Sequence, residues 1–262
     1  IPESAFSYCH SLDIFEIPST VTSIGDLAFG NADFRSIKIP PNVTSIGQNV
    51  FHGTIQLENI FVDPSNPEYA SIDGVLFTKD LHTIIRYPSH KPGNTYEIPS
   101  TVTQIDSCAF SECDNLTNII IPSSVTSIRH AAFASCDHLT AITIPASVTF
   151  LGTSLFSFCS NLEKVHFLCP LTDISCMMFS QCHSLVSIES PSSQSVEIVP
   201  NSQSMPFVIP QGVMSIEENA FSMTESKSIF IPSSVHSIGT YALSDFEAIH
   251  VDPNNPCYTS VG

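Results

Sequence analysis

The residues of this 262-residue chain with the widest range of chemistry are nine cysteines and ten histidines. Five of the cysteines each follow a phenylalanine by three residues: Cys9, Cys113, Cys136, Cys159 and Cys182. Thiols that recur at one position can pair as disulfides, bind a metal or act as nucleophiles. Which of these roles is open to them depends on the repeat that positions them.

The repeat is marked by a phenylalanine, or once a leucine, roughly every 23 residues. These register residues are Phe6, Phe29, Phe51, Phe110, Phe133, Phe156, Phe179, Phe221 and Leu243. The surrounding pattern is I-P-x-x-V-x-x-I-G-x-x-A-F-x-x-C-x-x-L-x-x-I-x-I-P. Similarity at one fixed period of this length predicts a solenoid of stacked coils.

A single coil is best seen from Asn115 to Phe133. Ile119 and Ile121 lie two apart, which predicts a strand, and Pro122 ends it because proline cannot donate to a ladder. Apolar residues then recur at three- to four-residue spacing, which predicts a short strand or tight turn followed by a brief helix. Stacked at roughly 4.8 Å per strand, eleven or so coils would form a rod or horseshoe about 50 Å long.

The coils resemble those of the BspA-like, or treponemal-type, leucine-rich repeat family. The copies that carry the resemblance are IPSTVTSIGDLAF at 17–29, IPPNVTSIGQNVF at 39–51, IPSSVTSIRHAAF at 121–133 and IPSSVHSIGTYAL at 231–243. The segment VDPSNPEYASIDGVLFTKDLHTIIRYP at 62–88 is similar to the hairpin insertion of such arrays. The resemblance covers essentially the whole chain.

The resemblance implies a leucine-rich repeat solenoid of mixed helix and strand, mostly β, with a parallel sheet on its concave face. It also implies a cell-surface or secreted protein of mucosal bacteria or parasitic protists, which adheres to host matrix proteins or to other cells. It implies no active site and no cofactor. Function must still be argued from a site, since one fold serves many functions.

Breaks in the period predict the organisation of the chain. We expect leucine-rich repeats at 1–62, a β-meander insertion at 63–98, repeats at 99–191, a degenerate or irregular coil at 192–209, repeats at 210–250 and the truncated start of a second insertion at 251–262. In the first insertion, Asp73-Gly74 predicts a type I′ hairpin turn. We expect the meander to project from the stack, and both chain ends to be fragment boundaries that leave any leader or anchor outside the sequence.

The cysteine column is best explained as small buried groups. Other coils place Ala32, Thr54, Thr224 and Phe246 at this position, so it does not require sulfur. Parallel side chains in a column suit disulfides poorly, although Cys108, Cys169, Cys176 and Cys257 lie outside the column and could pair elsewhere. The pairs Cys9-His10, Cys136-x-His138 and Cys182-His183 lack the spacing of a metal site, so we expect no metal.

The charge balance excludes some partners. The formal net charge is −17, from 8 Lys and Arg against 25 Asp and Glu. Such a chain should repel nucleic acid and anionic membranes, because phosphate binding needs clustered basic side chains. Glycine-rich phosphate loops and paired-carboxylate motifs are absent from the sequence, so we expect no enzyme activity.

The outward positions of the predicted strands form a stripe that could bind a protein. The stripe consists of Glu16, Lys38, Phe61, Glu97, Ile120, Thr143, His166, Glu189, Val208, Phe230 and His250. Exposed apolar groups tend to mark interaction sites, although scattered ones are ordinary on protein surfaces. Asn42 and Asn115 begin acceptor motifs for N-glycosylation. The alternatives to recognition are a display scaffold without a ligand of its own, or an intracellular scaffold.

Overall fold

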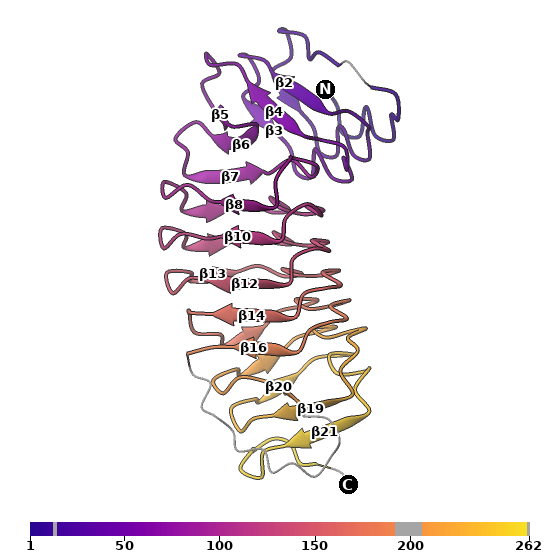
Figure 1. Ribbon diagram of the computed structural model, residues 1–262, viewed down its shortest axis with the longest axis vertical. Helices are drawn as coiled ribbons and strands as arrows, with labels where there is room; N and C mark the ends of the chain where they lie inside the picture. The colour runs from indigo at the N-terminus through magenta and orange to yellow at the C-terminus, as the bar shows by residue number, and fades with distance from the viewer. Residues whose placement is uncertain (13–14, 192–205, 261–262) are drawn as a thin grey trace.

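The computed structural model describes residues 1–12, 15–191 and 206–260. It is an elongated parallel β-solenoid of about nine stacked coils, with the chain ends at opposite ends of the stack (Figure 1). The expected number of eleven or so coils is too high, because the insertion at 63–98 forms a meander in place of regular coils. Most coils have a first strand, a proline turn, a short second strand and a turn corner around the register phenylalanine.

The first strands lie side by side along one face, which we call the first-strand face. They are β2 (Ser36–Ile39), β4 (Asn59–Val62), β8 (Thr95–Glu97), β10 (Asn118–Ile120), β12 (Ala141–Ile144), β14 (Lys164–Phe167), β16 (Ser187–Glu189), β17 (Phe207–Val208), β19 (Ser228–Ile231) and β21 (Ala248–Val251). They pair in parallel within four groups, β2-β4, β8-β10, β12-β14-β16 and β17-β19-β21.

The two-residue second strands form another face, which we call the second-strand face. They are β1 (Ser23–Ile24), β3 (Ser45–Ile46), β9 (Gln104–Ile105), β11 (Ser127–Ile128), β13 (Phe150–Leu151), β15 (Asp173–Ile174), β18 (Ser215–Ile216) and β20 (Ser237–Ile238). They pair in parallel as β1-β3, β9-β11-β13 and β15-β18-β20.

The expected helix after the second strand is wrong, because the described residues contain no helix. Ala131 and Ser135, two residues before and after Phe133, have left-handed backbone with φ of 51° and 56°. The N–H groups of Ala131, Phe133 and Ser135 donate to carbonyl groups of the next coil at 2.9, 3.1 and 2.8 Å. In a helix these N–H groups would instead donate to carbonyl oxygens four residues earlier in the same segment. The turn corner is therefore a third ladder between coils.

The meander does not project from the stack, contrary to expectation. Its strands are β5 (Tyr69–Ile72), β6 (Val75–Thr78) and β7 (Thr83–Arg86), and the β5–β6 turn has positive φ at Asp73 and Gly74, as predicted. Strand β7 joins the second-strand ladder by pairing in parallel with β9. Val75 and Phe77 pack into the large central core, whereas Leu76 packs into the core of the N-terminal coils. The meander thus joins the two cores.

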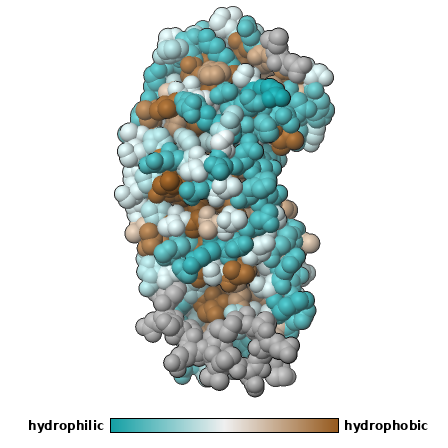
Figure 2. All heavy atoms as spheres, viewed as in Figure 1, coloured by the Kyte–Doolittle hydropathy of each residue, from teal (hydrophilic) through white to brown (hydrophobic). Residues whose placement is uncertain are grey.

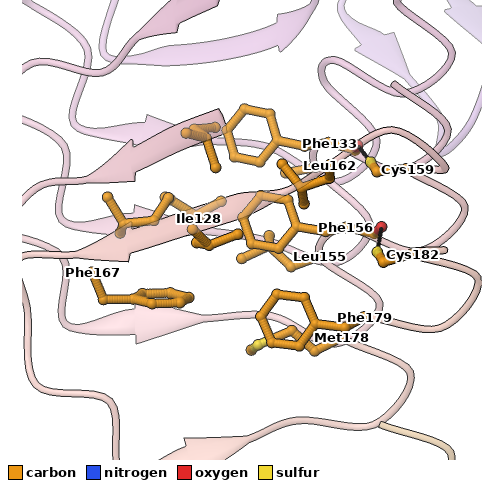
Figure 3. Close-up of a cluster of buried hydrophobic side chains, with 14 of the residues drawn as sticks. Ile128, Phe133, Leu155, Phe156, Cys159, Leu162, Phe167, Met178, Phe179 and Cys182 are labelled. Atoms are coloured by element: carbon orange, nitrogen blue, oxygen red, sulfur yellow. Dashed lines mark hydrogen bonds between the residues drawn. The ribbon is translucent and has the colours of Figure 1, made fainter. Parts of the chain in front are cut away.

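The core is built around a column of phenylalanine rings. Phe133 is fully buried between Phe110 and Phe156, with ring centroids 5.6 and 5.8 Å away. Figure 3 shows Phe133, Phe156 and Phe179 in successive coils with leucine and isoleucine side chains around them. Phe179 stacks directly on Phe221, 42 residues later in the sequence, at 5.6 Å. The predicted irregular coil at 192–209 falls mostly outside the described residues, and at its end Phe207 and Val208 form β17.

The last residues repeat the contacts that begin the meander. The Asn66 amide donates to the carbonyl oxygens of Pro40 and Val43, both at 2.9 Å. The Asn255 amide does the same toward Pro232 and Val235, at 2.7 and 3.0 Å. Both asparagines are buried and hold the incoming chain against the preceding proline turn.

Candidate binding surface

The stripe predicted from the sequence lies in register along the first-strand face. Parallel pairing places Lys38 beside Phe61, and Glu97 beside Ile120. The two longer rows are Thr143–His166–Glu189 and Val208–Phe230–His250. Glu16 is exposed, but it lies outside the strands. The structure therefore brings the stripe together as four short rows.

Exposure differs along the stripe. Lys38, Phe61, Glu97, Ile120, Thr143 and His250 are exposed, whereas His166, Glu189, Val208 and Phe230 are half-buried. Phe61 and Ile120 are 49% and 45% exposed, which is unusual for large apolar side chains. These two residues are the best apolar contacts that the stripe offers.

A second outward column, which the sequence interpretation missed, runs beside the stripe. Its members are mostly small or uncharged: Ser36, Asn59, Thr95, Asn118, Ala141, Lys164, Ser187, Ser228 and Ala248. They come two residues before the stripe residues, and strand periodicity places such positions on the same face. Their small size leaves the flanks of the stripe side chains uncovered.

The first-strand face is hollowed where β10 and β12 lie next to each other without forming a ladder. This hollow of about 390 Å³ is lined by Ile120, Ile121, Ala141, Thr143 and Leu168, among others. Ala141 and Thr143 are small side chains of β12 between larger neighbours on both sides. On the face shown in Figure 2, apolar side chains gather in separate patches among hydrophilic ones. A partner would therefore contact discrete apolar points.

Ion pairs neutralise much of the basic charge on this face. Lys38 Nζ lies 3.3 Å from Asp63 Oδ2, and Lys164 Nζ lies 2.5 Å from Glu189 Oε1. Hydrogen bonds from Ser65 lower the pKa of Asp63, and the nearby positive charge of Lys38 lowers it further. Because the chain as a whole has a net charge of −17, we expect basic partners to be favoured over acidic ones.

All nine cysteines lie in the described residues and all are free. Cys136, Cys159 and Cys182 are fully buried, and each thiol lies 3.0–3.1 Å from the carbonyl oxygen of the register phenylalanine one coil earlier. Burial raises the pKa of Cys182 to about 12, and burial likewise raises the pKa of Cys113 and Cys159 well above the ordinary thiol value. A protonated thiol is a poor nucleophile, so the column is a packing element.

The histidines beside the cysteines point to partners other than a metal. His10 Nδ1 lies 3.1 Å from Asp33 Oδ2, and His138 Nδ1 lies 2.5 Å from the Asp114 carbonyl oxygen. Within residues 1–12, 15–191 and 206–260, no three His, Cys, Asp or Glu side chains gather in the geometry of a metal site.

The two glycosylation motifs differ in accessibility. Asn42 is exposed, and its amide donates to the Ser19 carbonyl oxygen at 2.7 Å. Asn115 is half-buried, and its amide lies 3.4 Å from the Lys91 carbonyl oxygen. A glycan on either amide nitrogen would compete with these contacts, and Asn42 is the more accessible acceptor.

Comparison with known proteins identifies relatives of the whole array. The family model described as a BspA type leucine rich repeat region matches residues 1–91, 89–204 and 199–259. None of the curated proteins compared with the chain matches it. In the described residues, no helix has the length and apolar character needed to cross a membrane.

Several solved structures share the fold. A leucine-rich repeat protein from Eubacterium ventriosum is 28% identical, with a TM-score of 0.84 over 98% of this chain and 72% of that one. A leucine rich cell surface protein from Faecalibacterium prausnitzii is 27% identical, with a TM-score of 0.59 over 99% of this chain and 60% of that one. The pneumococcal vaccine antigen PcpA is 18% identical, with a TM-score of 0.58 over 100% of this chain and 67% of that one, and it supports the fold alone.

Proposed function

The chain belongs to the family of BspA-type leucine-rich repeat proteins, and we propose that it is a cell-surface or secreted protein that adheres to host matrix or to other cells. Membership of this family supports a protein-interaction role for the chain, and the F. prausnitzii neighbour is named a cell surface protein. The adhesive role, the surface location and the stripe as its binding site are our inferences from this relationship.

The observation that supports recognition at the stripe is the exposure of Phe61 and Ile120 on an ordered, parallel array of strands. Both lie on paired first strands, and the neighbouring outward positions, Asn59 and Asn118, carry smaller polar side chains. Exposed apolar anchors in a polar surround match the anatomy of protein interfaces, where a few large side chains carry most of the binding energy. The hollow beside Ile120 offers a recess for a partner side chain.

The experiment measures binding of the purified chain to immobilised matrix and serum proteins at two salt concentrations. The double variant Phe61→Ser/Ile120→Ser should weaken binding at least tenfold and leave the fold intact, because both side chains are exposed. Phe230→Ser is tested separately, because Phe230 is half-buried and its loss also affects packing.

The matched control is Ile55→Ser/Phe158→Ser, which removes two side chains of similar exposure, 56% and 49%, away from the stripe. Unchanged affinity in the stripe variant would remove the stripe from the proposal. Absence of binding to every immobilised protein would favour the display-scaffold alternative.

A further inference from the structure

The second-strand face is interrupted by a slit between β13 and β15. Within the ladders β9-β11-β13 and β15-β18-β20, each coil donates backbone N–H groups to the coil before it: Phe150 and Gly152, for example, donate to Thr126 and Ile128 at 3.3 and 2.8 Å. The corresponding bonds one coil later, from Asp173 and Ser175 toward Thr149 and Leu151, are absent from the backbone bonds of the described residues. Two strand edges therefore face each other without backbone pairing, and at the end of the slit the Ser175 hydroxyl donates to the Gly152 carbonyl oxygen at 3.0 Å.

The slit opens only one wall of the solenoid. At the turn corner the same two coils remain joined, because Ser154 N–H donates to the Cys176 carbonyl oxygen at 2.8 Å and the rings of Phe156 and Phe179 stack at 5.7 Å. On the first-strand face, β12 and β14 pair in register at four positions. The opening is thus held in shape by intact contacts on its other sides.

The amino-acid sequence differs from that of the two preceding coils at the point where the ladder stops. In the two preceding coils, Ser124 and Ser147 donate their hydroxyls to the carbonyl oxygens of Val102 and Val125 at 2.7 and 2.6 Å. Pro170 occupies the equivalent position, 23 residues after Ser147, and proline has neither a hydroxyl nor an N–H to donate. The bridge between coils is lost where the slit begins.

A cavity of about 860 Å³ fills the slit, and both unpaired edges line it. Its volume lies within the range of ligand pockets. Thr149 and Leu151 present carbonyl oxygens, and Asp173 and Ser175 present N–H groups. Exposed strand edges of this kind bind extended peptides by strand addition, with main-chain hydrogen bonds providing affinity.

The side chains of the slit alternate between two environments. Phe150 and Asp173 point outward and are exposed, whereas their strand neighbours Leu151 and Ile174 are half-buried and buried. Asp173 accepts hydrogen bonds from Thr172 and Ser215 hydroxyls, and Glu217, which also lines the cavity, accepts one from the Cys176 N–H. Among the ion pairs of the described residues, neither carboxylate has a cationic partner.

We propose that this slit binds an extended segment of a partner protein, which adds as a strand between β13 and β15 and alternates apolar with basic residues. Its apolar side chains would face inward toward Leu151, and its Lys or Arg side chains would lie outward, against the ring of Phe150 and the carboxylates of Asp173 and Glu217. A cation at this place would be stabilised by cation–π attraction to the aromatic ring and by charge-assisted hydrogen bonds to the two carboxylates. This inference rests on the proposed protein-recognition function, but it places the binding site on the second-strand face, whereas the stripe lies on the first-strand face.

The test uses the full chain and the fluorescent peptide acetyl-TVKVRVT-amide, with binding measured by anisotropy. Saturable binding is expected, together with slowed amide exchange at Asp173 and Ser175. The same peptide N-methylated at alternate residues should bind at least tenfold more weakly, because it cannot complete the ladder. The charge-reversed peptide acetyl-TVEVEVT-amide should also bind at least tenfold more weakly.

Variants separate the slit from the stripe. Asp173→Asn and Phe150→Ser should each weaken peptide binding several-fold, whereas Glu97→Gln, which removes a carboxylate from the first-strand face, should not. Equal binding of the N-methylated peptide, or no binding of the parent peptide, would overturn the slit proposal. Self-association of the chain that Phe150→Ser abolishes would assign the slit to a second copy, and would overturn it as well.

The outcome for the slit is distinguishable from the outcome for the stripe. If Phe61→Ser/Ile120→Ser abolishes binding to immobilised proteins while the peptide does not bind, the proposed function stands and the slit proposal falls. If the peptide binds as expected while that double variant changes nothing, the slit is the recognition site and the stripe is not.

Discussion

The thiol of Cys159 lies 3.0 Å from the carbonyl oxygen of Phe133, one coil earlier in the stack. Both groups are buried, and no other hydrogen bond to this oxygen is found among the described residues. The thiol therefore supplies a donor where the turn corner leaves a buried acceptor. This explains why a small residue with a weak donor suits the position better than a purely apolar one.

Cys159→Ala should lower the free energy of unfolding by about 1–3 kcal/mol, because it leaves the Phe133 carbonyl oxygen buried without a donor. Cys159→Ser should cost less, because its hydroxyl can replace the thiol as donor. Chemical denaturation of the two variants measures the difference. Equal losses would show that packing volume alone matters at this position.

The stability of the chain should decrease as the pH rises above about 9. Burial raises the pKa of Cys182 to about 12, so the unfolded thiol ionises before the folded one. The unfolded state thus loses protons that the folded state keeps, and stability is constant below the unfolded pKa and falls between about 9 and 12. Burial also raises the pKa values of Tyr87 and Tyr96, which adds to the loss above about pH 10.

The melting temperature should therefore decrease between pH 8 and pH 10.5. Cys182→Ala should be less stable at pH 8 but show a shallower decrease, because it lacks the titrating thiol. A parallel decrease in both proteins would exclude Cys182 as a contributor.

Phe133→Ala should lower the free energy of unfolding by about 3–5 kcal/mol by emptying a fully buried site between two rings. Phe158→Ala is the control, since Phe158 is 49% exposed and its loss should cost less than about 1 kcal/mol. Thermal or chemical denaturation of both variants provides the comparison. A negligible loss for Phe133→Ala would contradict its place in the column.

Periodicity was sufficient to predict the stack, the phenylalanine column and the cysteine column, since each follows from one residue type at one spacing. It was not sufficient for the turn corner. The three- to four-residue spacing around Phe133 is the same for a helix and for consecutive turns, and only the backbone hydrogen bonds separate them. Residue type could have distinguished the turns from a helix. The left-handed positions of two coils are occupied by Asn31, Asn49 and Gly53, and asparagine and glycine tolerate that conformation.

The stripe was predictable because strand alternation defines which residues face outward. The slit was not predictable, because it depends on backbone hydrogen bonds that are missing between two coils of ordinary length. Pro170 in place of a bridging serine is visible in the sequence, but its meaning requires knowing that Ser124 and Ser147 donate to the preceding coil. The burial of the meander also depends on tertiary contacts, since its alternation fits a projecting hairpin equally well.

The left-handed turn positions predict an unusual response to glycine. Ser135 has φ of 56°, a region that is strained for residues with a Cβ, and glycine already occupies the equivalent position at Gly53. Ser135→Gly should therefore raise the free energy of unfolding, by up to about 1 kcal/mol. Ser123→Gly, at an exposed position without positive φ, should lower it by about 0.5–1 kcal/mol. The same sign for both variants would contradict the argument from strain.

The junction between the N-terminal coils and the meander depends on one buried cation. Arg86 is 4% exposed, and its guanidinium donates to the carbonyl oxygens of Cys108 at 2.7 Å and Phe51 at 3.3 Å. Glu112 Oε2 lies 3.6 Å from Arg86 Nη2 and accepts the Gly53 N–H at 2.7 Å. Arg86 and Glu112 therefore connect the coils on either side of the meander.

Arg86→Met should lower the free energy of unfolding by about 3–5 kcal/mol, because it removes these bonds and leaves the Glu112 carboxylate without its buried cation. Glu112→Gln should also destabilise, since it leaves Arg86 uncompensated. The double variant should cost less than the sum of the two, which a double-mutant cycle in denaturant measures. Arg35→Met is the control, because the Arg35 side chain in the Arg35–Glu58 ion pair is largely exposed. This pair should contribute less than about 1 kcal/mol to the free energy of unfolding. Additive losses for Arg86 and Glu112 would show that the two side chains act independently at the junction.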